Sequence, residues 1–455
     1  MEQQQQRKNL TLIKPFRALR PAPGRAAEVL APPYDVLSSA EARERAKGKP
    51  WSFLHVSKAE IDLPAGTDPY DRAVYAKAAE NLKRMVDAGV LIRDAKPCLY
   101  VYRLTWRGHV QTGLAAAASL ADYATNRIRK HEYTTPAKED DRVRQIEAVN
   151  AQTGPVMLGY PTAPAIDTLL ATAAAGAPDI DVTADDGVRH RLWVIADDAA
   201  IAALTRAIDA LPALYIADGH HRSAAALRVA ARFQAEWKPV SRPENAPTLN
   251  MGARSDAKPV PTFAERAPSR GGEGSHCYFL SVLFPQNEMT ILDYNRVLRD
   301  LNGRTATTLL AELQQRYQVE ACDQPVRPAA SGELGMYLDG SWYRLRPGLE
   351  AASAAKSEDP VGRLPITLLT RNIIEPIFGI TDPRTDKRID FVGGGRGLAE
   401  LAHRVSSGEM AVAFALYPTQ MSELMAVADA GEIMPPKSTW FEPKLADGMV
   451  SHVLD

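Results

Sequence analysis

The chain has 455 residues, of which 45% are hydrophobic and 24% charged, and a formal net charge of −1. The length predicts two or three domains, and the small net charge excludes a global electrostatic attraction to nucleic acid or to an anionic membrane. Three widely spaced cysteines, Cys98, Cys277 and Cys322, exclude a disulfide framework and a zinc-knuckle spacing. Because the N-terminal segment is polar and no run approaches ~18 apolar residues, we expect a cytoplasmic protein without a membrane partner.

Short apolar runs alternate with prolines over residues 10–56, which predicts short strands and tight turns. Residues 68–90 have apolar residues at helical spacing, and Gly89 is a typical end for such a helix. Residues 98–120 have the character of two paired strands joined at Arg107-Gly108. That two-residue polar connection predicts a β-hairpin.

A second helix is predicted from Pro136, because proline is favoured in the first turn of a helix. Val143, Ile146 and Val149 share one face of this helix, and Gly154 is its expected end. The segment 211–233 then predicts a strand, a turn and a third helix.

Composition divides the chain into three parts. Residues 239–275 are poor in aliphatic residues and rich in Pro, Gly, Ser and charge, which predicts a flexible linker or loop. Before it we expect a core over residues 10–238, and after it a second α+β portion over 276–455 that closes a cleft, with a helix near 305–317. Strands and helices are mixed throughout, so the predicted fold class is mixed α/β.

The turn from Asp218 to Arg222 is the strongest candidate site. Asp218 or Gly219 is the expected N-cap of a helix that begins at the histidines, so unpaired N–H groups and the positive end of the helix dipole lie there. Arg222 in the first turn opposes the dipole, and Gly219 permits close approach of a ligand to the backbone. These features predict a phosphate site. The alternative is a simple cap, with one packing histidine and a surface arginine.

Other polar residues are candidates for substrate, metal or base. Asp35 follows two prolines and a tyrosine, which favours a rigidly held base or, alternatively, the start of a turn. His131 and Glu132 precede the second predicted helix; they could ligate Mg²⁺, orient a substrate amine or cap that helix. His55 lies in an alternating run that predicts a strand, with a substrate contact or a solvated face as the two interpretations.

The proline-rich segment near the end of the chain offers further polar groups. Lys437, Ser438 and Thr439 stand on a backbone stiffened by neighbouring prolines. They could bring a cation and hydroxyl groups to a phosphate, or the segment could serve only as a strap on the fold.

Five blocks together resemble the bacterial and archaeal domain of unknown function numbered 1015: APPYDVLS at 31–38, KHEYT at 130–134, YIADGHHR at 215–222, NRVLRDLNG at 295–303 and MPPKSTWFEPKL at 434–445. The block from Asp218 to Arg222 also resembles the D-G-H-x-R motif of free serine kinases in the ParB/sulfiredoxin superfamily. That resemblance implies a ParB/sulfiredoxin-like core in which residues 218–222 contact nucleotide phosphates and lie near the substrate.

The combined expectation is a small-molecule phosphotransferase, most specifically a free serine kinase that can run in reverse on phosphoserine, with ATP or ADP and Mg²⁺ as cofactors. Asp35, His220 and His221 are the expected catalytic residues, and Glu132 and Asp218 the expected metal ligands. One alternative is a nucleotide-binding ParB-like regulator that binds DNA or a protein partner. Another is a phosphatase of a different phosphorylated metabolite.

Overall fold

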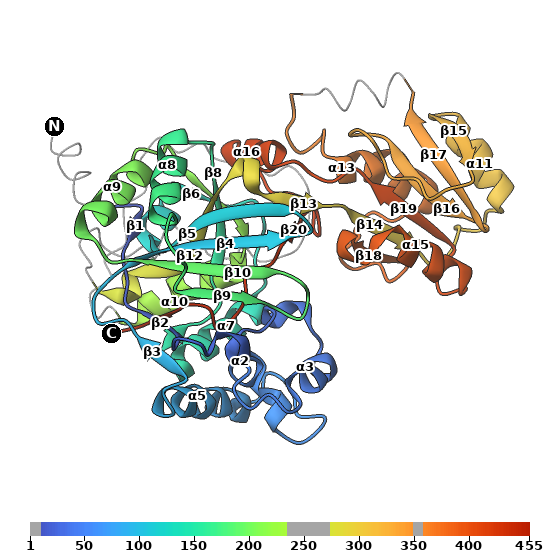
Figure 1. Cartoon of the computed structure of the whole chain (residues 1–455). Helices are drawn as coiled ribbons and strands as arrows, with labels where there is room; N and C mark the ends of the chain where they lie inside the picture. The colour runs from blue at the N-terminus through green and yellow to red at the C-terminus, as the bar shows by residue number, and fades with distance from the viewer. Residues whose placement is uncertain (1–10, 234–273, 349–357) are drawn as a thin grey trace. The chain divides into compact units, whose positions relative to one another are not determined.

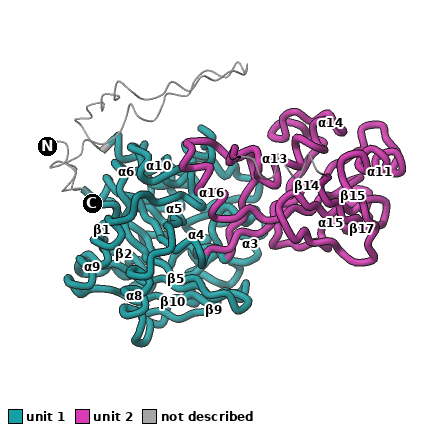
Figure 2. Tube along the Cα trace, turned by 90° about the horizontal axis from the view of Figure 1, so that it is seen from above, with its two compact units in different colours: residues 1–288, 443–455 teal, residues 289–442 magenta. Residues whose placement is uncertain are grey.

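The computed structural model describes residues 11–233, 274–348 and 358–455 (Figure 1). The chain separates into two compact units: unit 1 comprises residues 1–288 and 443–455, and unit 2 comprises residues 289–442 (Figure 2). Strands and helices alternate in both units, which confirms the predicted mixed α/β class. In the part of the chain that the structure describes, no helix has the length and apolar character that a bilayer span requires.

The main sheet of unit 1 has the strand order β6-β11-β8-β12-β5-β4-β10-β9, and β1 pairs additionally with β5. Most neighbours are antiparallel, but β6 and β11 run parallel, as do β8 and β12. Its strands are β1 (Ile13–Lys14), β4 (Leu99–Trp106), β5 (His109–Ser119), β6 (Ile128–Arg129), β8 (Val156–Tyr160), β9 (Ile180–Thr183), β10 (Arg189–Ile195), β11 (Leu214–Asp218) and β12 (Tyr278–Pro285).

A smaller sheet in unit 1 has the order β3-β2-β21-β7. It joins the two ends of the unit, because β21 (Ser451–Val453) pairs with β2 (Ala18–Pro21) and with β7 (Ala151–Gln152), while β3 (Leu91–Arg93) lies at the edge. The helices of unit 1 are α2 (Ala26–Val29), α3 (Ser39–Ala46), α4 (Leu54–Ser57), α5 (Arg72–Asp87), α6 (Leu120–Ala124), α7 (Pro136–Val149), α8 (Pro164–Ala173), α9 (Asp198–Asp209) and α10 (His220–Phe233).

Buried apolar side chains explain why α10 is fixed in place. Ala226, Leu227 and Ala230 join the core of the main sheet, which also receives side chains from α8 and α9. Ala225 and Val229 on another face of α10 pack with α7. The helix is therefore buried on two sides, so its first turn is held at a defined position relative to the end of β11.

Unit 2 is built on a sheet of order β15-β17-β16-β19-β14-β18 and a two-stranded sheet β13-β20. Its strands are β13 (Thr290–Leu292), β14 (Tyr294–Leu298), β15 (Tyr317–Cys322), β16 (Leu334–Leu338), β17 (Ser341–Pro347), β18 (Ile389–Gly393), β19 (Val412–Leu416) and β20 (Trp440–Glu442). Its helices are α11 (Ala306–Gln314), α13 (Pro365–Leu369), α14 (Glu375–Phe378), α15 (Gly397–Ser406) and α16 (Met421–Asp429).

Several local predictions are confirmed. The hairpin β4–β5 turns at Arg107 and Gly108, whose φ angles of 48° and 83° are those of a type I′ turn. The helix predicted in 68–90 is α5, and Asp71 caps its start by accepting the Ala73 N–H. The strand, turn and helix predicted around Asp218 are β11 and α10, and α10 begins at His220.

Three local predictions are wrong. Residues 39–46 form the helix α3 instead of a strand or turn, because Ser38 and Glu41 make a capping box. The run around His55 is the short helix α4, so its residues do not alternate across a strand. Helix α7 ends before Gly154, because Asn150 adopts a left-handed conformation with φ 48° and leads into β7.

The domain boundaries of the structure also differ from the expected 10–238 and 276–455. Strand β12 lies between β5 and β8 of the main sheet, so residues 276–288 belong to unit 1. Residues 443–455 return to unit 1, where Asp447 forms a backbone bridge with Ala31. Most of the expected linker, residues 239–273, lies outside the described residues.

The contact between β5 and β12 gives a test of the packing. An added Cβ at Gly113 would lie 2.6 Å from the Leu283 carbonyl oxygen and from the Phe284 ring. We expect Gly113→Ala to lower the free energy of unfolding by roughly 1–3 kcal/mol, because backbone atoms have to move. Urea denaturation measures this effect. Gly176→Ala is the control, since nothing lies within 4 Å of its Cβ position; equal stability of the two variants would contradict the packing.

Candidate functional site

The candidate site is built on the turn between β11 and α10. Gly219 has φ +104°, a conformation that side chains with a Cβ rarely adopt. The Gly219 carbonyl accepts the Arg222 and Ser223 N–H groups at 2.9 and 3.0 Å, and this closes the first turn of the helix. The N–H groups before Arg222 have no partner inside the helix, and the positive end of the helix dipole lies here.

Two cations converge on the carboxylate that precedes this turn. Arg222 lies 3.4 Å from Asp218 and Lys444 lies 3.3 Å from it. Arg222 also donates to the Pro155 carbonyl, and its guanidinium lies 3.0 to 3.3 Å from the position of a Cβ on Gly219. Glycine at this position therefore leaves room for the guanidinium, in addition to permitting the positive φ.

The charges of this group set each other's pKa values. Burial alone would raise the pKa of Asp218, but Lys444 and Arg222 hold it well below its usual range. Burial would lower the pKa of Arg222, whereas Asp218, Asp35 and Tyr34 raise it. Asp218 and Arg222 are therefore both charged at neutral pH, and Asp35 is a further acidic neighbour of Arg222.

A small polar cavity lies beside Arg222. Its volume is about 30 Å³, far below the ~300–1,000 Å³ of a typical ligand pocket, so it can take water or one small group. All of its lining residues belong to unit 1. The polar ones include Tyr34, Ser57, Arg142, Thr153, Arg222 and Asp447.

Asp447 is a functional candidate that sequence reasoning missed. Its side chain is buried, and Oδ2 accepts the Tyr34 N–H at 3.2 Å, whereas Oδ1 has no hydrogen-bond partner among the described residues. Burial raises the pKa of Asp447 to about 7; Asp35 raises it too, while Arg222 and Arg142 lower it. The only local sequence signal is the pair Asp447-Gly448, which repeats the Asp-Gly pair at 218–219.

Asp35 lies near this group but in a different environment. It belongs to a short 3₁₀ helix, Tyr34–Val36, and its side chain is exposed. Its charge raises the pKa of both Arg222 and Asp447, so it is an electrostatic neighbour of the cavity.

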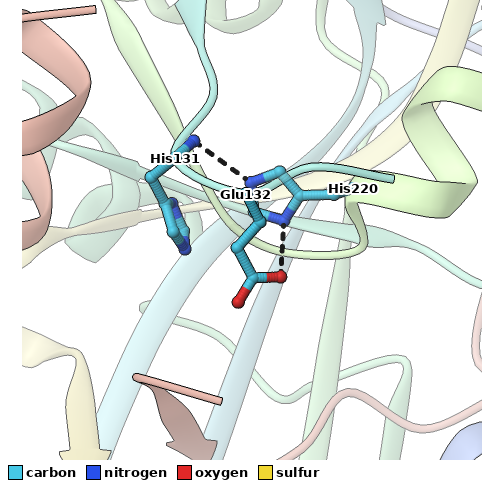
Figure 3. A group of neighbouring side chains, drawn as sticks. All are labelled: His131, Glu132 and His220. Atoms are coloured by element: carbon cyan, nitrogen blue, oxygen red, sulfur yellow. Dashed lines mark hydrogen bonds and ion pairs between the residues drawn. The ribbon is translucent and has the colours of Figure 1, made fainter. Parts of the chain in front are cut away.

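His131, Glu132 and His220 form a second polar group (Figure 3). The Glu132 carboxylate lies 3.6 Å from Nδ1 of His220, and the His131 N–H lies 3.4 Å from its Nε2. The two imidazole rings are 4.4 Å apart between centroids and nearly perpendicular. This donor set fits Mg²⁺ poorly, because Mg²⁺ prefers oxygen ligands, and Asp218, the other predicted ligand, faces Lys444 and Arg222 instead.

Two predicted histidines make structural contacts. His221 accepts the N–H of Thr135, the N-cap residue of α7, at 3.1 Å. His55 lies 2.8 Å from Asp62 through Nδ1 and 3.1 Å from the Lys49 carbonyl through Nε2. Both ring nitrogens of His55 are therefore engaged within unit 1.

Lys437, Ser438 and Thr439 belong to unit 2. The buried Arg296 side chain donates to the Pro436 and Lys437 carbonyls at 3.2 and 2.9 Å. The Ser438 hydroxyl donates to the Pro435 carbonyl at 2.5 Å. These bonds fix the backbone of the segment, as expected for a strap.

The raised pKa of Asp447 predicts how stability depends on pH. Because the folded state holds the proton more tightly than the unfolded state, the stability that protonation contributes is present below about pH 4 and is lost as pH rises towards 7. Asp447→Asn removes this loss. We expect the free energy of unfolding of the Asp447→Asn variant, relative to that of the natural chain, to increase by roughly 2 kcal/mol between pH 5 and pH 8.

Urea denaturation at both pH values measures this difference. Asp198→Asn is the control, because the Asp198 side chain is 94% exposed. A pH-independent difference between the Asp447→Asn variant and the natural chain would show that Asp447 titrates as it does in the unfolded state.

Comparisons with solved structures give weak likenesses. A free serine kinase in complex with AMP has 12% identity and a TM-score of 0.32, with 72% of this chain and 86% of that chain covered. A conserved hypothetical protein from Pyrococcus furiosus has 12% identity and a TM-score of 0.31, with 73% and 93% covered. C-terminally truncated SbnI from Staphylococcus aureus has 10% identity and a TM-score of 0.32, with 73% and 85% covered. Scores this low assign neither fold nor activity.

The sequence comparisons are more decisive about the family. No curated protein matches the sequence at a significant level. The family model described as protein of unknown function (DUF1015) matches residues 13–367, which is well over half of the chain. The chain therefore belongs to the DUF1015 family.

Proposed function

We propose that the protein is a small-molecule phosphotransferase that holds a phosphoryl group at the first turn of α10. The observation that carries this proposal is the convergence of Arg222 and Lys444 on Asp218, at 3.4 and 3.3 Å. These two cations lie beside the partial positive charge of the helix N-terminus. A phosphoryl group held here contacts both cations and accepts the N–H groups of the first turn.

The acceptor in this proposal is a hydroxyl group. Its oxygen forms a bond to phosphorus, the bond from phosphorus to the leaving oxygen of the donor breaks, and the hydroxyl proton passes to a base. We assign the base to Asp447 instead of Asp35, because the pKa of Asp447 is about 7 and a general base works best with a pKa near the working pH. Arg222 and Arg142 stabilise the carboxylate form.

The finer proposal is a free serine kinase that also runs in reverse on phosphoserine. It is supported by the resemblance of residues 218–222 to the D-G-H-x-R motif of free serine kinases. ATP or ADP is the proposed donor, and Mg²⁺ held by the phosphate oxygens accompanies it. The nucleoside lies outside the cavity of about 30 Å³ beside Arg222, because that volume takes only water or one small group.

The cation pair predicts a specific loss of activity. We expect Arg222→Lys and Lys444→Met each to lower kcat/KM about 100-fold, because each removes a contact to the transferring phosphoryl group. Phosphorus NMR with Mg²⁺, ATP or ADP and a panel of hydroxy amino acids measures turnover.

Arg228→Lys is the matched control for this experiment. Arg228 lies on the same helix as Arg222 but pairs with Glu139 and Asp140. The Arg228→Lys variant should therefore turn over as fast as the natural chain. Full activity in the Arg222 and Lys444 variants would refute the phosphate site, and phosphate release without an acceptor would point to a phosphatase.

The assignment of the base predicts a difference between two carboxylates. Asp447→Asn should lower kcat by 100-fold or more, because a general base contributes ~10²–10⁴ to the rate. Asp35→Asn should change kcat about tenfold at most, since Asp35 acts only through its field on Arg222 and Asp447. Steady-state kinetics of both variants from pH 5 to 9 measures kcat for each. A larger loss of kcat in Asp35→Asn than in Asp447→Asn would assign the base to Asp35.

A further inference from the structure

We propose that His131, Glu132 and His220 form a binding site for a divalent transition metal of the zinc class. One ligand atom from each residue lies within 4.8 Å of the other two. Figure 3 shows the two rings and the carboxylate around a common space. Metal binding here does not depend on the phosphotransferase proposal.

The sheet topology brings these residues together. Strands β6 and β11 are parallel neighbours, with Ile128 opposite Leu214 and Arg129 opposite Tyr215. The residues that follow the two strands therefore leave the sheet at the same edge. His131 and Glu132 follow β6, and His220 follows β11, so segments about ninety positions apart in sequence supply one cluster.

The His131 ring is the observation that points to a ligand. The side chain has no exposed surface, and neither ring nitrogen has a hydrogen-bond partner of normal geometry among the described residues. Burial lowers the pKa of this ring to about 3, although the nearby backbone of Ile216 and the charge of Asp218 oppose that shift. A neutral ring keeps a lone pair for a metal, and the Ile216 backbone can orient the ring, as second partners of metal-bound histidines do.

His220 needs only a small change to become a ligand. It is buried, and burial is the main cause that holds its pKa well below the usual value. A metal on Nδ1 puts the remaining proton on Nε2 and ends the contact from the His131 N–H. That contact is long, at 3.4 Å, and the His131 N–H has to turn to another acceptor when the metal binds.

Glu132 completes the donor set and adjusts to the metal. In a tetrahedral site with metal–ligand bonds of ~2.0–2.2 Å, ligand atoms lie about 3.4 Å apart, so the cluster has to contract. The Glu132 side chain is 32% exposed, whereas that of His220 is 3% exposed, so Glu132 makes most of the adjustment.

The donor types select the metal. Imidazole nitrogen suits zinc and its neighbours in the first transition row, whereas Mg²⁺ and Ca²⁺ prefer a shell of oxygen atoms. Two histidines and one glutamate with an open position are a ligand set of catalytic zinc sites. We therefore expect Zn²⁺, and Co²⁺ as its spectroscopic substitute, to bind in preference to Mg²⁺.

Metal titration of the full chain tests this site without any nucleotide. After treatment with a chelator, the protein should bind one Zn²⁺ per chain by calorimetry and by elemental analysis, and a tenfold excess of Mg²⁺ should not displace it. Glu132→Gln and His131→Asn should each weaken Zn²⁺ binding at least tenfold. Glu132→Gln keeps the inference testable if the buried His131 variant does not fold.

The control is His221→Asn, which changes the neighbouring histidine that caps α7 and should leave Zn²⁺ affinity unchanged. The Co²⁺ spectrum should show nitrogen and oxygen ligation. A thiolate charge-transfer band would place the metal on a cysteine instead and overturn the site. Absence of stoichiometric Zn²⁺ binding, or unchanged Zn²⁺ binding in Glu132→Gln, would overturn the site too. A failure to phosphorylate serine in the phosphorus NMR assay would count only against the phosphotransferase proposal.

Discussion

The ion group of Asp218, Arg222 and Lys444 is the interaction on which the rest of the site depends. It ties the end of β11 to the first turn of α10 and to a segment more than two hundred residues later in the chain. A partly buried carboxylate with two cations is stable only when the surroundings hold all three in register. The apolar packing of α10 against the main sheet and against α7 provides that rigidity.

Neighbouring carboxylates of unit 1 have opposite protonation behaviour because their surroundings differ. Asp218 is held charged by Lys444 and Arg222 beside it, whereas Asp447 is buried next to a cavity with one oxygen unpaired among the described residues. When the surroundings drive the pKa values of two carboxyl groups apart, one site can hold both a permanent charge and a group that accepts a proton. The third group, around His131 and His220, contributes neutral nitrogen donors instead of charge.

Local chemistry made part of this structure predictable. The Asp218-Gly219 turn, the first turn of α10 and the hairpin at Arg107-Gly108 each depend on a few adjacent residues, and the sequence predicted all of them correctly. The helix α3 was missed because its signal is a capping box inside a proline-rich segment. The short helix at His55 has no such signal and is held by contacts from elsewhere in the fold, including a bond from Asn81 to the His55 carbonyl.

The partners within the site were not predictable, because they depend on long-range pairing. Nothing near Asp447 in the sequence indicates that it meets Tyr34 and Arg222, and the cluster of His131 with His220 requires the parallel pairing of β6 with β11. The unit boundaries failed for the same reason, since β12 and β21 enter sheets formed by much earlier strands.

The return of residues 443–455 to unit 1 has a consequence for how the chain is made. Synthesis proceeds from the N-terminus, and domains fold as units while the chain emerges. Unit 2 is complete at residue 442, before Lys444 and Asp447 have been added. Unit 2 is therefore an insert within unit 1, and the cavity next to Arg222 is assembled only after the whole of unit 2 has been synthesised.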